Sequence, residues 1–149
     1  MSIRATVLRQ RIFGLTSECK RPFAESEGGT AMRAIIVDDE PIMIKGFIRM
    51  SASIEDLQIV GRFQKPLEAL AFAKENSIDI AFLDARMPKM SGIELAEHLR
   101  EIDPKVLIVF LSAYGEYVLD SNRIGADYYI MKPYTEETLE LAMERMRLL

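Results

Sequence analysis

Short apolar runs alternate with segments of helical hydrophobic period from Met32 to the end of the chain. Strands that alternate with helices predict βαβ units, which build a parallel sheet with helices on both faces. The runs that we interpret as strands are residues 33–37, 57–63, 78–83, 106–111 and 127–131. This pattern predicts the α/β class, with a doubly wound five-stranded parallel sheet in a three-layer sandwich.

Four of these runs end on polar residues of chemically reactive types. Asp38 and Asp39 follow the first run, and Asp84 follows the third. Ser112 and Lys132 follow the fourth and the fifth runs. In an open parallel sheet, ligands bind in the crevice outside the carboxyl ends of the strands. The positions therefore predict a functional site at one edge of the sheet, built from carboxylates, a hydroxyl and an amine.

The three carboxylates predict a cation site. Two carboxylates ~4 Å apart repel each other by ~4 kcal/mol at an effective dielectric constant of about 20. Mg²⁺ is the natural candidate, because proteins usually bind it through one or two carboxylates, with waters and a phosphate as further ligands. Asp84 is the best candidate nucleophile, since it ends the central strand and carboxylates form acyl phosphates. Ser112 and Lys132 would then stabilise two phosphoryl oxygens.

Helix signals separate the strands. Pro41 and Pro66 stand where proline favours a first helical turn, and Ser91 with Glu94 forms a capping box. The helix after Pro66 carries Leu67, Leu70, Ala71 and Lys74 at helical spacing, and the helix after Ser91 carries Ile93, Ala96 and Leu99 on one face. In the last helix we expect a buried face of Leu139, Ala142, Met143 and Met146. A further helix is expected over residues 114–124, and Gly125 is placed to end it in the left-handed conformation.

Charge and composition limit the partners, the membrane topology and the cellular compartment that we expect for this chain. Residues 1–31 carry five basic and three acidic side chains of the 19 and 23 in the chain, which leaves a net charge of −6 from Met32 onward. Since nucleic-acid affinity comes largely from Lys and Arg, we expect no nucleic-acid contact by this domain itself. No apolar run is long enough to span a membrane. The lone Cys19 excludes a disulfide framework and favours a reducing, cytoplasmic compartment.

Residues 1–31 differ from the rest of the chain. They show no sustained hydrophobic period and close on a Glu-, Ser- and Gly-rich stretch, which is typical of a flexible joint. Met32 directly precedes the first strand and would make a natural initiator. We interpret residues 1–31 as an N-terminal tail or extension and residues 32–149 as one domain. A transit peptide is the alternative for the Arg-bearing start.

Four motifs in this chain together resemble the receiver domains of two-component response regulators. They are VDDEP at residues 37–41, FLDARMP at 82–88 with Ser91-Gly92 after it, LSAY at 111–114, and GADYYIMKP at 125–133. Each motif alone is modest evidence, but all four stand in order at predicted strand ends. The resemblance covers residues 32–149 and implies a flavodoxin-like fold with strand order 2-1-3-4-5.

The resemblance implies a role for each matching residue of the acidic site. It implies that Asp84 accepts a phosphoryl group and that Asp38 and Asp39 organise Mg²⁺. The backbone carbonyl of Arg86 would be a further metal ligand, and Lys132 would pair with the phosphoryl group. The domain would catalyse only its own phosphorylation and dephosphorylation.

The resemblance also implies a conformational switch. Ser112 would be the switch hydroxyl, and Tyr129 the aromatic side chain that moves inward with it. Arg86 and Tyr114 occupy positions at which side chains tune the loss of the phosphoryl group. A sensor histidine kinase would be the donor. The output would be a homodimer through the fourth helix, the fifth strand and the last helix, or an effector domain, with transcription regulation as the output of a longer regulator.

Two other functions stay open. A Mg²⁺-dependent aspartyl-phosphate phosphohydrolase would use the same topology, but such enzymes usually carry a second acid two residues after the nucleophile, where this chain has Arg86. A flavodoxin-like cofactor binder would need a phosphate loop rich in Gly, Ser or Thr after the first strand. The acidic residues Asp38, Asp39 and Glu40 would repel a phosphate there unless a metal intervened.

Overall fold

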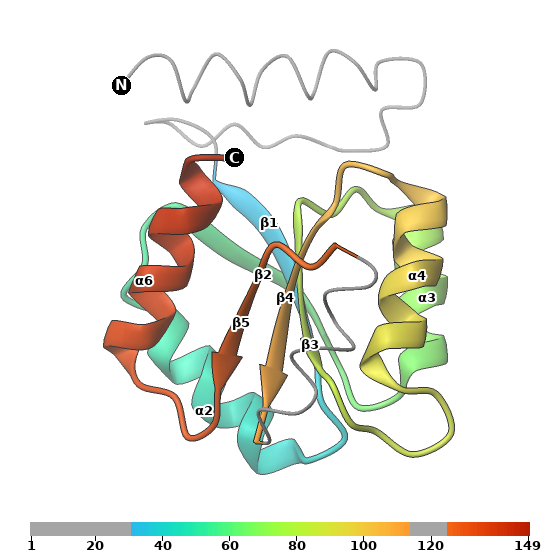
Figure 1. Cartoon of the computed structure of the whole chain (residues 1–149), viewed down its shortest axis with the longest axis horizontal. Helices are drawn as coiled ribbons and strands as arrows, with labels where there is room; N and C mark the ends of the chain where they lie inside the picture. The colour runs from blue at the N-terminus through green and yellow to red at the C-terminus, as the bar shows by residue number, and fades with distance from the viewer. Residues whose placement is uncertain (1–30, 114–124) are drawn as a thin grey trace.

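The computed structural model describes residues 31–113 and 125–149, which form a parallel sheet with helices on both faces (Figure 1). The strand order is β2-β1-β3-β4-β5, and every neighbouring pair is parallel. The elements are β1 (Met32–Val37), α2 (Pro41–Ser51), β2 (Leu57–Phe63), α3 (Pro66–Glu75), β3 (Ile80–Asp84), α4 (Gly92–Ile102), β4 (Leu107–Ser112), β5 (Tyr128–Met131) and α6 (Glu136–Arg147). The predicted fold class and strand order are confirmed.

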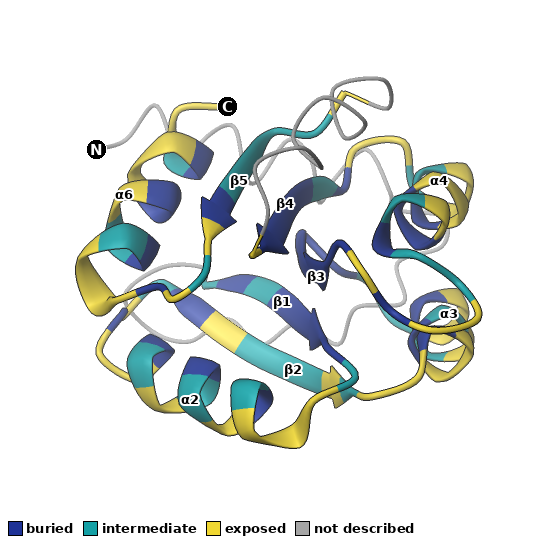
Figure 2. Ribbon diagram, turned by 60° about the horizontal axis from the view of Figure 1, so that its bottom comes forward, coloured by how far each residue is buried: buried dark blue, intermediate teal, exposed yellow. Residues whose placement is uncertain are grey.

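Two hydrophobic layers lie on opposite faces of the sheet (Figure 2). Helices α2 and α6 cover one face, where Phe47 and Met143 are fully buried. Helices α3 and α4 cover the other face, where Leu95 is fully buried. Alternate residues of β1 enter the two layers, Ile36 on the first face and Ile35 on the second. The central strands are thus buried on both faces, as a doubly wound sheet requires.

The predicted helix starts are confirmed. Proline opens α2 and α3 at a first-turn position, where its missing N–H costs no helical hydrogen bond. In α4 the Ser91 hydroxyl accepts from the Glu94 N–H, and the Glu94 carboxylate accepts from the Ser91 N–H. Thr135 and Thr138 form the equivalent pair at α6. The predicted buried face of α6 is also the observed one.

The helix predicted after Pro66 is present as α3, but the residues that indicated its helical spacing are not the ones it buries. The helix buries Pro66, Ala69 and Ala73, whereas Leu67 is 69% exposed and Leu70 only half-buried. The buried face of α3 thus consists of small residues, and the larger Leu70 and Phe72 are partly buried against the same layer. In α4, Leu95 is buried with Ala96 and Leu99, and Ile93 is only half-buried.

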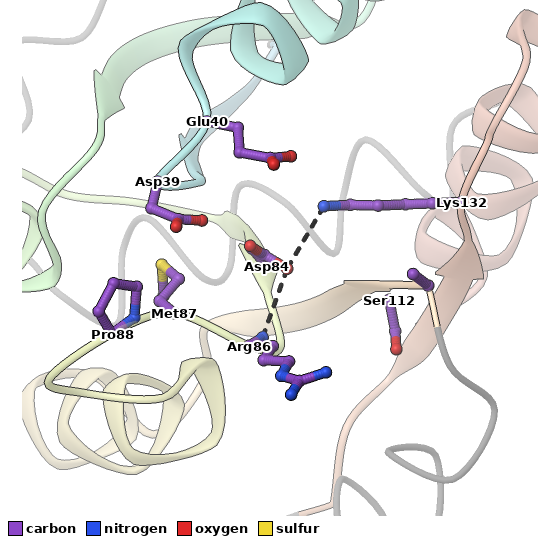
Figure 3. A pocket seen from close by; sticks show the side chains of 9 residues that line it. Asp39, Glu40, Asp84, Arg86, Met87, Pro88, Ser112 and Lys132 are labelled. Atoms are coloured by element: carbon purple, nitrogen blue, oxygen red, sulfur yellow. Dashed lines mark hydrogen bonds and ion pairs between the residues drawn. The ribbon is translucent and has the colours of Figure 1, made fainter.

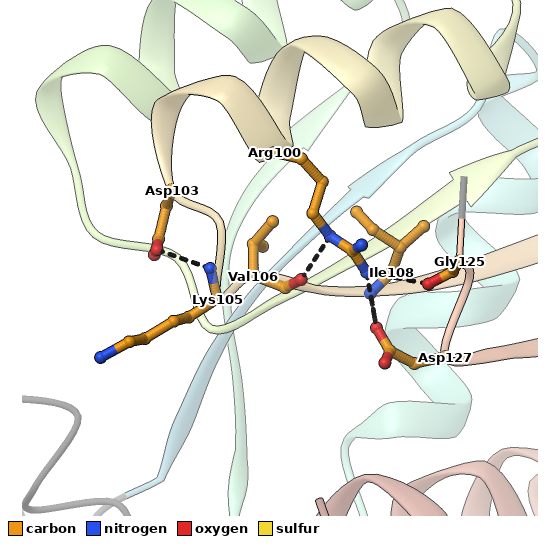
Figure 4. Close-up of polar contacts among 7 residues, drawn as sticks. All are labelled: Arg100, Asp103, Lys105, Val106, Ile108, Gly125 and Asp127. Carbon is orange, nitrogen blue, oxygen red and sulfur yellow. Dashed lines mark hydrogen bonds and ion pairs between the residues drawn. The ribbon is translucent and has the colours of Figure 1, made fainter.

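A group of hydrogen bonds around Arg100, called here the Arg100 cluster, joins the amino ends of β4 and β5 to α4 (Figure 4). The Arg100 guanidinium donates to the Val106 carbonyl at 3.0 Å, to the Gly125 carbonyl at 3.2 Å and to the Asp127 carboxylate at 2.9 Å. The same Asp127 oxygen accepts from the Ile108 N–H at 2.8 Å. Gly125 has a φ of +72°, as its predicted left-handed conformation requires. This end of the sheet is therefore held by charged hydrogen bonds.

Register at the opposite end brings the reactive strand ends into one row. Val37 is paired with Leu83, Asp84 with Leu111, and Ser112 with Met131. Each residue that follows these positions therefore leaves the sheet at the same edge. No described helix is long and apolar enough to cross a membrane. The proposed tail, the helix over 114–124 and Tyr114 lie outside the described residues, and those interpretations stay predictions.

Candidate functional site

A pocket of about 470 Å³ opens at the carboxyl edge of the sheet (Figure 3). Loops after β1, β3, β4 and β5 supply its walls. Its lining residues are Asp39, Glu40, Asp84, Arg86, Met87, Pro88, Ser112, Ala113 and Lys132. The edge predicted from the strand ends is thus where the structure has a pocket. Glu40, Met87 and Pro88 line it as well, although the sequence motifs gave them no role.

Three carboxylates gather at this pocket. Oxygens of Asp38, Asp39 and Asp84 all lie within 4.8 Å of one another. Asp38 and Asp84 are buried, and Asp39 is half-buried. Such a set of hard oxygen donors, open to a pocket on one side, suits a small divalent cation. These three side chains are the residues that could hold one, and the backbone carbonyl of Arg86 stays a predicted further ligand.

Turns at the strand ends orient the two buried carboxylates. The Asp38 carboxylate accepts from the Glu40 N–H at 2.9 Å, and the Asp38 N–H donates to the Phe63 carbonyl at 3.0 Å. The Asp84 carboxylate accepts from the Arg86 N–H at 3.3 Å. Each aspartate therefore turns the chain out of its strand and keeps other carboxylate lone pairs for a ligand.

Lys132 lies between the two buried carboxylates. Its Nζ is 3.1 Å from Asp38 Oδ2 and 3.4 Å from Asp84 Oδ1, and its side chain is 13% exposed. The Lys132 N–H donates to the Ser112 carbonyl at 2.8 Å, and the following peptide bond to Pro133 is cis. The Lys132 amine reaches toward Asp84 in the pocket (Figure 3).

Burial and the surplus of negative charge together raise the pKa of Asp84. The pKa of Asp84 is raised to about 7, first by burial and then by the charge of Asp38, although Lys132 and the Arg86 N–H lower it. Burial lowers the pKa of Lys132, but the two carboxylates outweigh burial, so the pKa is raised and the amine stays charged. Without a further cation, the site therefore tends to take up a proton at Asp84.

Gly92 fits the backbone of β3 closely. Its N–H donates to the Ala85 carbonyl at 3.1 Å. A Cβ at this position would overlap the Asp84 carbonyl oxygen and lie 3.0 Å from Ala85 Cα. Only glycine fits without a shift of the chain that carries Asp84. The sequence contained Gly92 in a motif, but its physical reason depends on the approach of α4 to β3.

Of the predicted switch and tuning residues that the structure describes, Ser112 and Arg86 line the pocket and Tyr129 does not. Ser112 is buried and Arg86 is exposed, and both line the pocket. Tyr129 is half-buried and packs with the layer under α3 and α4, and it does not line the pocket. It is paired in register with Phe110 of β4, two residues before Ser112. Ser112 and Tyr129 therefore lie two positions apart along two adjacent strands.

In metal-free buffer, we expect Asp84 to make the folded state less stable as pH rises from about 4 to about 7. Folded Asp84 keeps a proton that unfolded Asp84, with an ordinary pKa of 3.8, has lost. The unfolded state then binds fewer protons, so the free energy of unfolding falls by up to about 1.4 kcal/mol per pH unit. Urea unfolding across this window would measure it, with Asp84→Asn as the control. A parent-minus-variant difference that is flat with pH would contradict the raised pKa.

Comparison with known proteins agrees with the geometry. Residues 34–144 match the family described as "Response regulator receiver domain". The chain is 30% identical over 118 residues to Protein MrkE of Klebsiella pneumoniae, with 79% of this chain and 44% of MrkE covered. It is 33% identical over 116 residues to the transcriptional regulatory protein BtsR of Salmonella typhi, with 78% and 48% covered. The chain thus spans about half the length of these relatives.

Solved structures give the same result for the fold. The response regulatory domain of MrkE has a TM-score of 0.72 at 30% identity, covering 78% of this chain and 96% of that one. The REC domain of AraT, a response regulator from Geobacillus stearothermophilus, has a TM-score of 0.70 at 26% identity, covering 80% and 95%. With this fold and the family match over most of its length, the chain belongs to the response regulator receiver domain family.

Proposed function

We propose that this domain is a phosphorylation-activated switch in which Asp84 accepts a phosphoryl group from a histidine kinase. The observation that carries the proposal is the acidic cluster of Asp38, Asp39 and Asp84, joined by Lys132 at one pocket. Receiver domains take phosphoryl groups from histidine kinases, and this chain belongs to the receiver domain family. The pocket of about 470 Å³ leaves room for a phosphoryl group beside Asp84.

The proposed chemistry uses five side chains and one backbone group. A carboxylate oxygen of Asp84 forms a bond to phosphorus while the bond between phosphorus and the histidine nitrogen breaks, and that nitrogen keeps the electron pair. Mg²⁺ held by the three carboxylates and the Arg86 carbonyl would neutralise charge on the phosphoryl oxygens. Lys132 already lies 3.4 Å from Asp84, so its amine needs little movement to pair with the new phosphoryl group. Ser112, which lines the same pocket, would donate to another oxygen.

The raised pKa of Asp84 sets a condition on this reaction. A protonated carboxyl group is a poor nucleophile, and Asp84 loses its proton only near pH 7 in the metal-free protein. Positive charge in the pocket lowers that pKa and keeps the oxygen reactive. Lys132 supplies one such charge, and a bound cation would supply the rest. The acceptor would therefore be most reactive when the metal site is filled.

The proposed output of the switch is a change in the surface formed by β5 and α6. We propose that Ser112 moves toward the phosphoryl group and that Tyr129 moves inward on the adjacent strand, which favours one arrangement of the face formed by β5 and α6. Exposed Met131 and Leu141 lie on these two elements. Relatives of about twice the length carry the name transcriptional regulatory protein, which supports control of transcription through an effector or partner.

A phosphohydrolase is less well supported. Such an enzyme would need a second acid two residues after Asp84 to activate the leaving group or water. Arg86 stands at that position, exposed at the pocket, and its N–H donates to Asp84. The domain would then catalyse only its own phosphorylation and dephosphorylation.

Replacing the proposed acceptor should abolish labelling. We expect Asp84→Asn to keep the fold but to accept no phosphoryl group from acetyl phosphate and Mg²⁺, because the amide keeps the volume and loses the nucleophile. Intact mass spectrometry would measure the adduct in parent and variant. Labelling of Asp84→Asn to the level of the parent would show that the acceptor is elsewhere.

Magnesium should stabilise the folded protein. At ten times the dissociation constant, binding to the folded state alone adds about 1.4 kcal/mol to the free energy of unfolding. We expect Asp39→Ala to remove this gain, whereas Glu97→Ala, at an exposed position of α4, should keep it. Thermal unfolding with and without Mg²⁺ would measure the effect. A melting temperature of the parent that does not change with Mg²⁺ would count against the metal site.

A phosphoryl mimic should favour self-association. We expect beryllofluoride with Mg²⁺ to tighten a dimer through the face of β5 and α6 by about 5- to 150-fold, which corresponds to a coupling of about 1–3 kcal/mol. Sedimentation at several concentrations would measure the association constant, with Tyr129→Ala as the variant that should respond less. Equal constants with and without the mimic would leave a separate partner or an effector domain as the output.

A further inference from the structure

Glu40 lines the acidic pocket, and the proposed chemistry leaves its carboxylate without a role. The residue follows Asp39 directly and precedes Pro41, where α2 begins. Its side chain is exposed, whereas Asp38 and Asp84 are buried. Glu40 therefore places a fourth negative charge at the pocket, at a position that solvent and an incoming phosphoryl donor can reach.

Backbone hydrogen bonds hold Glu40 next to the acidic site. The Glu40 N–H donates to the Asp38 carboxylate at 2.9 Å. The Glu40 carbonyl accepts from the Met43 N–H at 3.0 Å, in the first turn of α2. The residue is thus tied on one side to a buried aspartate of the site and on the other side to a packed helix. Its place at the pocket is set by the fold.

Helix capping does not account for the Glu40 side chain. Glu40 is the N-cap residue of α2, but its side chain makes no capping hydrogen bond to that helix. A carboxylate at a helix N-terminus can still interact favourably with the helix dipole. That role would change the stability of the folded domain and would not depend on which phosphoryl donor the domain meets.

Side chains of opposite charge border the pocket on two sides. Glu40 lies in the loop after β1 and Arg86 in the loop after β3, and both are exposed. Figure 3 shows their side chains on opposite sides of Asp84. A donor that approaches Asp84 therefore meets a negative charge on one side and a positive charge on the other. Such a field favours a donor whose displaced group is positively charged and can lie near Glu40.

We infer that Glu40 is a specificity-determining residue, which favours phosphoryl donors with a protonated imidazole as the displaced group over acyl phosphates. This inference rests on the proposed function. With the imidazole donor, an Asp84 oxygen bonds to phosphorus, the bond from phosphorus to the ring nitrogen breaks, and that nitrogen keeps the electron pair. The protonated ring thus leaves as neutral imidazole. With an acyl phosphate, the bond from phosphorus to oxygen breaks and a carboxylate leaves with the electron pair. Glu40 attracts the cationic ring and repels the departing carboxylate.

Labelling with two small donors tests the inference, because neither donor brings protein contacts of its own. The donors are monophosphoimidazole and acetyl phosphate, each with Mg²⁺ near pH 7, and intact mass spectrometry gives the second-order rate constants. In Glu40→Gln, we expect the constant for monophosphoimidazole to fall and that for acetyl phosphate to rise, each by about two- to fivefold, as loss of an exposed charge contact requires. The ratio of the two constants then changes by about four- to 25-fold. Glu40→Lys, which reverses the charge, should shift the ratio further in the same direction.

Two further variants complete the experiment. Glu97→Gln removes the same charge from an exposed position of α4 that does not line the pocket, so its ratio should equal that of the parent. Glu40→Ser removes the charge and supplies a hydroxyl suited to an N-cap position. It should change the ratio as Glu40→Gln does, and it replaces Glu40→Gln if that variant does not fold.

Three results would overturn the inference. One is a ratio that stays unchanged in the Glu40 variants. Another is an equal change of both rate constants, because a capping or packing role acts on both donors alike. The third is a change of the ratio in Glu97→Gln as large as in Glu40→Gln, which would be an effect of net charge. A parent that neither donor labels fails the proposed function itself, whereas a labelled parent whose ratio equals that of Glu40→Gln fails only this inference.

Discussion

The contact of Lys132 with Asp38 and Asp84 is the interaction on which the rest of the site depends. Two buried carboxylates so close together are costly, and the amine offsets part of that cost. It does not offset all of it, because the pKa of Asp84 remains raised to about 7. The three carboxylates therefore carry more negative charge than Lys132 balances, and a bound cation would offset the excess. Binding of a cation at this site would lower the raised pKa of Asp84.

The parallel sheet makes this imbalance possible. Strands in register end together, so residues distant in sequence leave the sheet at one edge. The buried rows beneath them, such as Phe82 and Val109, exclude water and keep the local dielectric constant low. At the opposite edge, Arg100 and Asp127 hold the amino ends of β4 and β5 with charged hydrogen bonds. One end of the sheet is thus fixed by satisfied polar groups, and the other carries groups that a ligand must satisfy.

The strand that carries Lys132 also connects the site to the surface. β5 runs from the Arg100 cluster to the acidic pocket, with Tyr129 half-buried between them. Its last residue, Met131, is exposed, and the chain then passes Lys132 and Tyr134 into α6. Under the proposed function, a shift of Lys132 toward a phosphoryl group would act on a short segment whose neighbours are already packed. This arrangement supports a discrete change of surface, since a packed layer has few intermediate positions.

The sequence by itself determined the order of strands and helices, the capping box of Ser91 and Glu94, and the reactive strand ends, because hydrophobic period and turn chemistry are local properties. It also carried four motifs whose combination identified the family. Contacts that cross the fold were decided only by the tertiary structure. The Lys132 amine meets Asp38 and Asp84 across 94 and 48 residues, and the approach of α4 to β3 gives Gly92 its reason. The inward face of α3 depends on packing against distant elements, which no local pattern encodes.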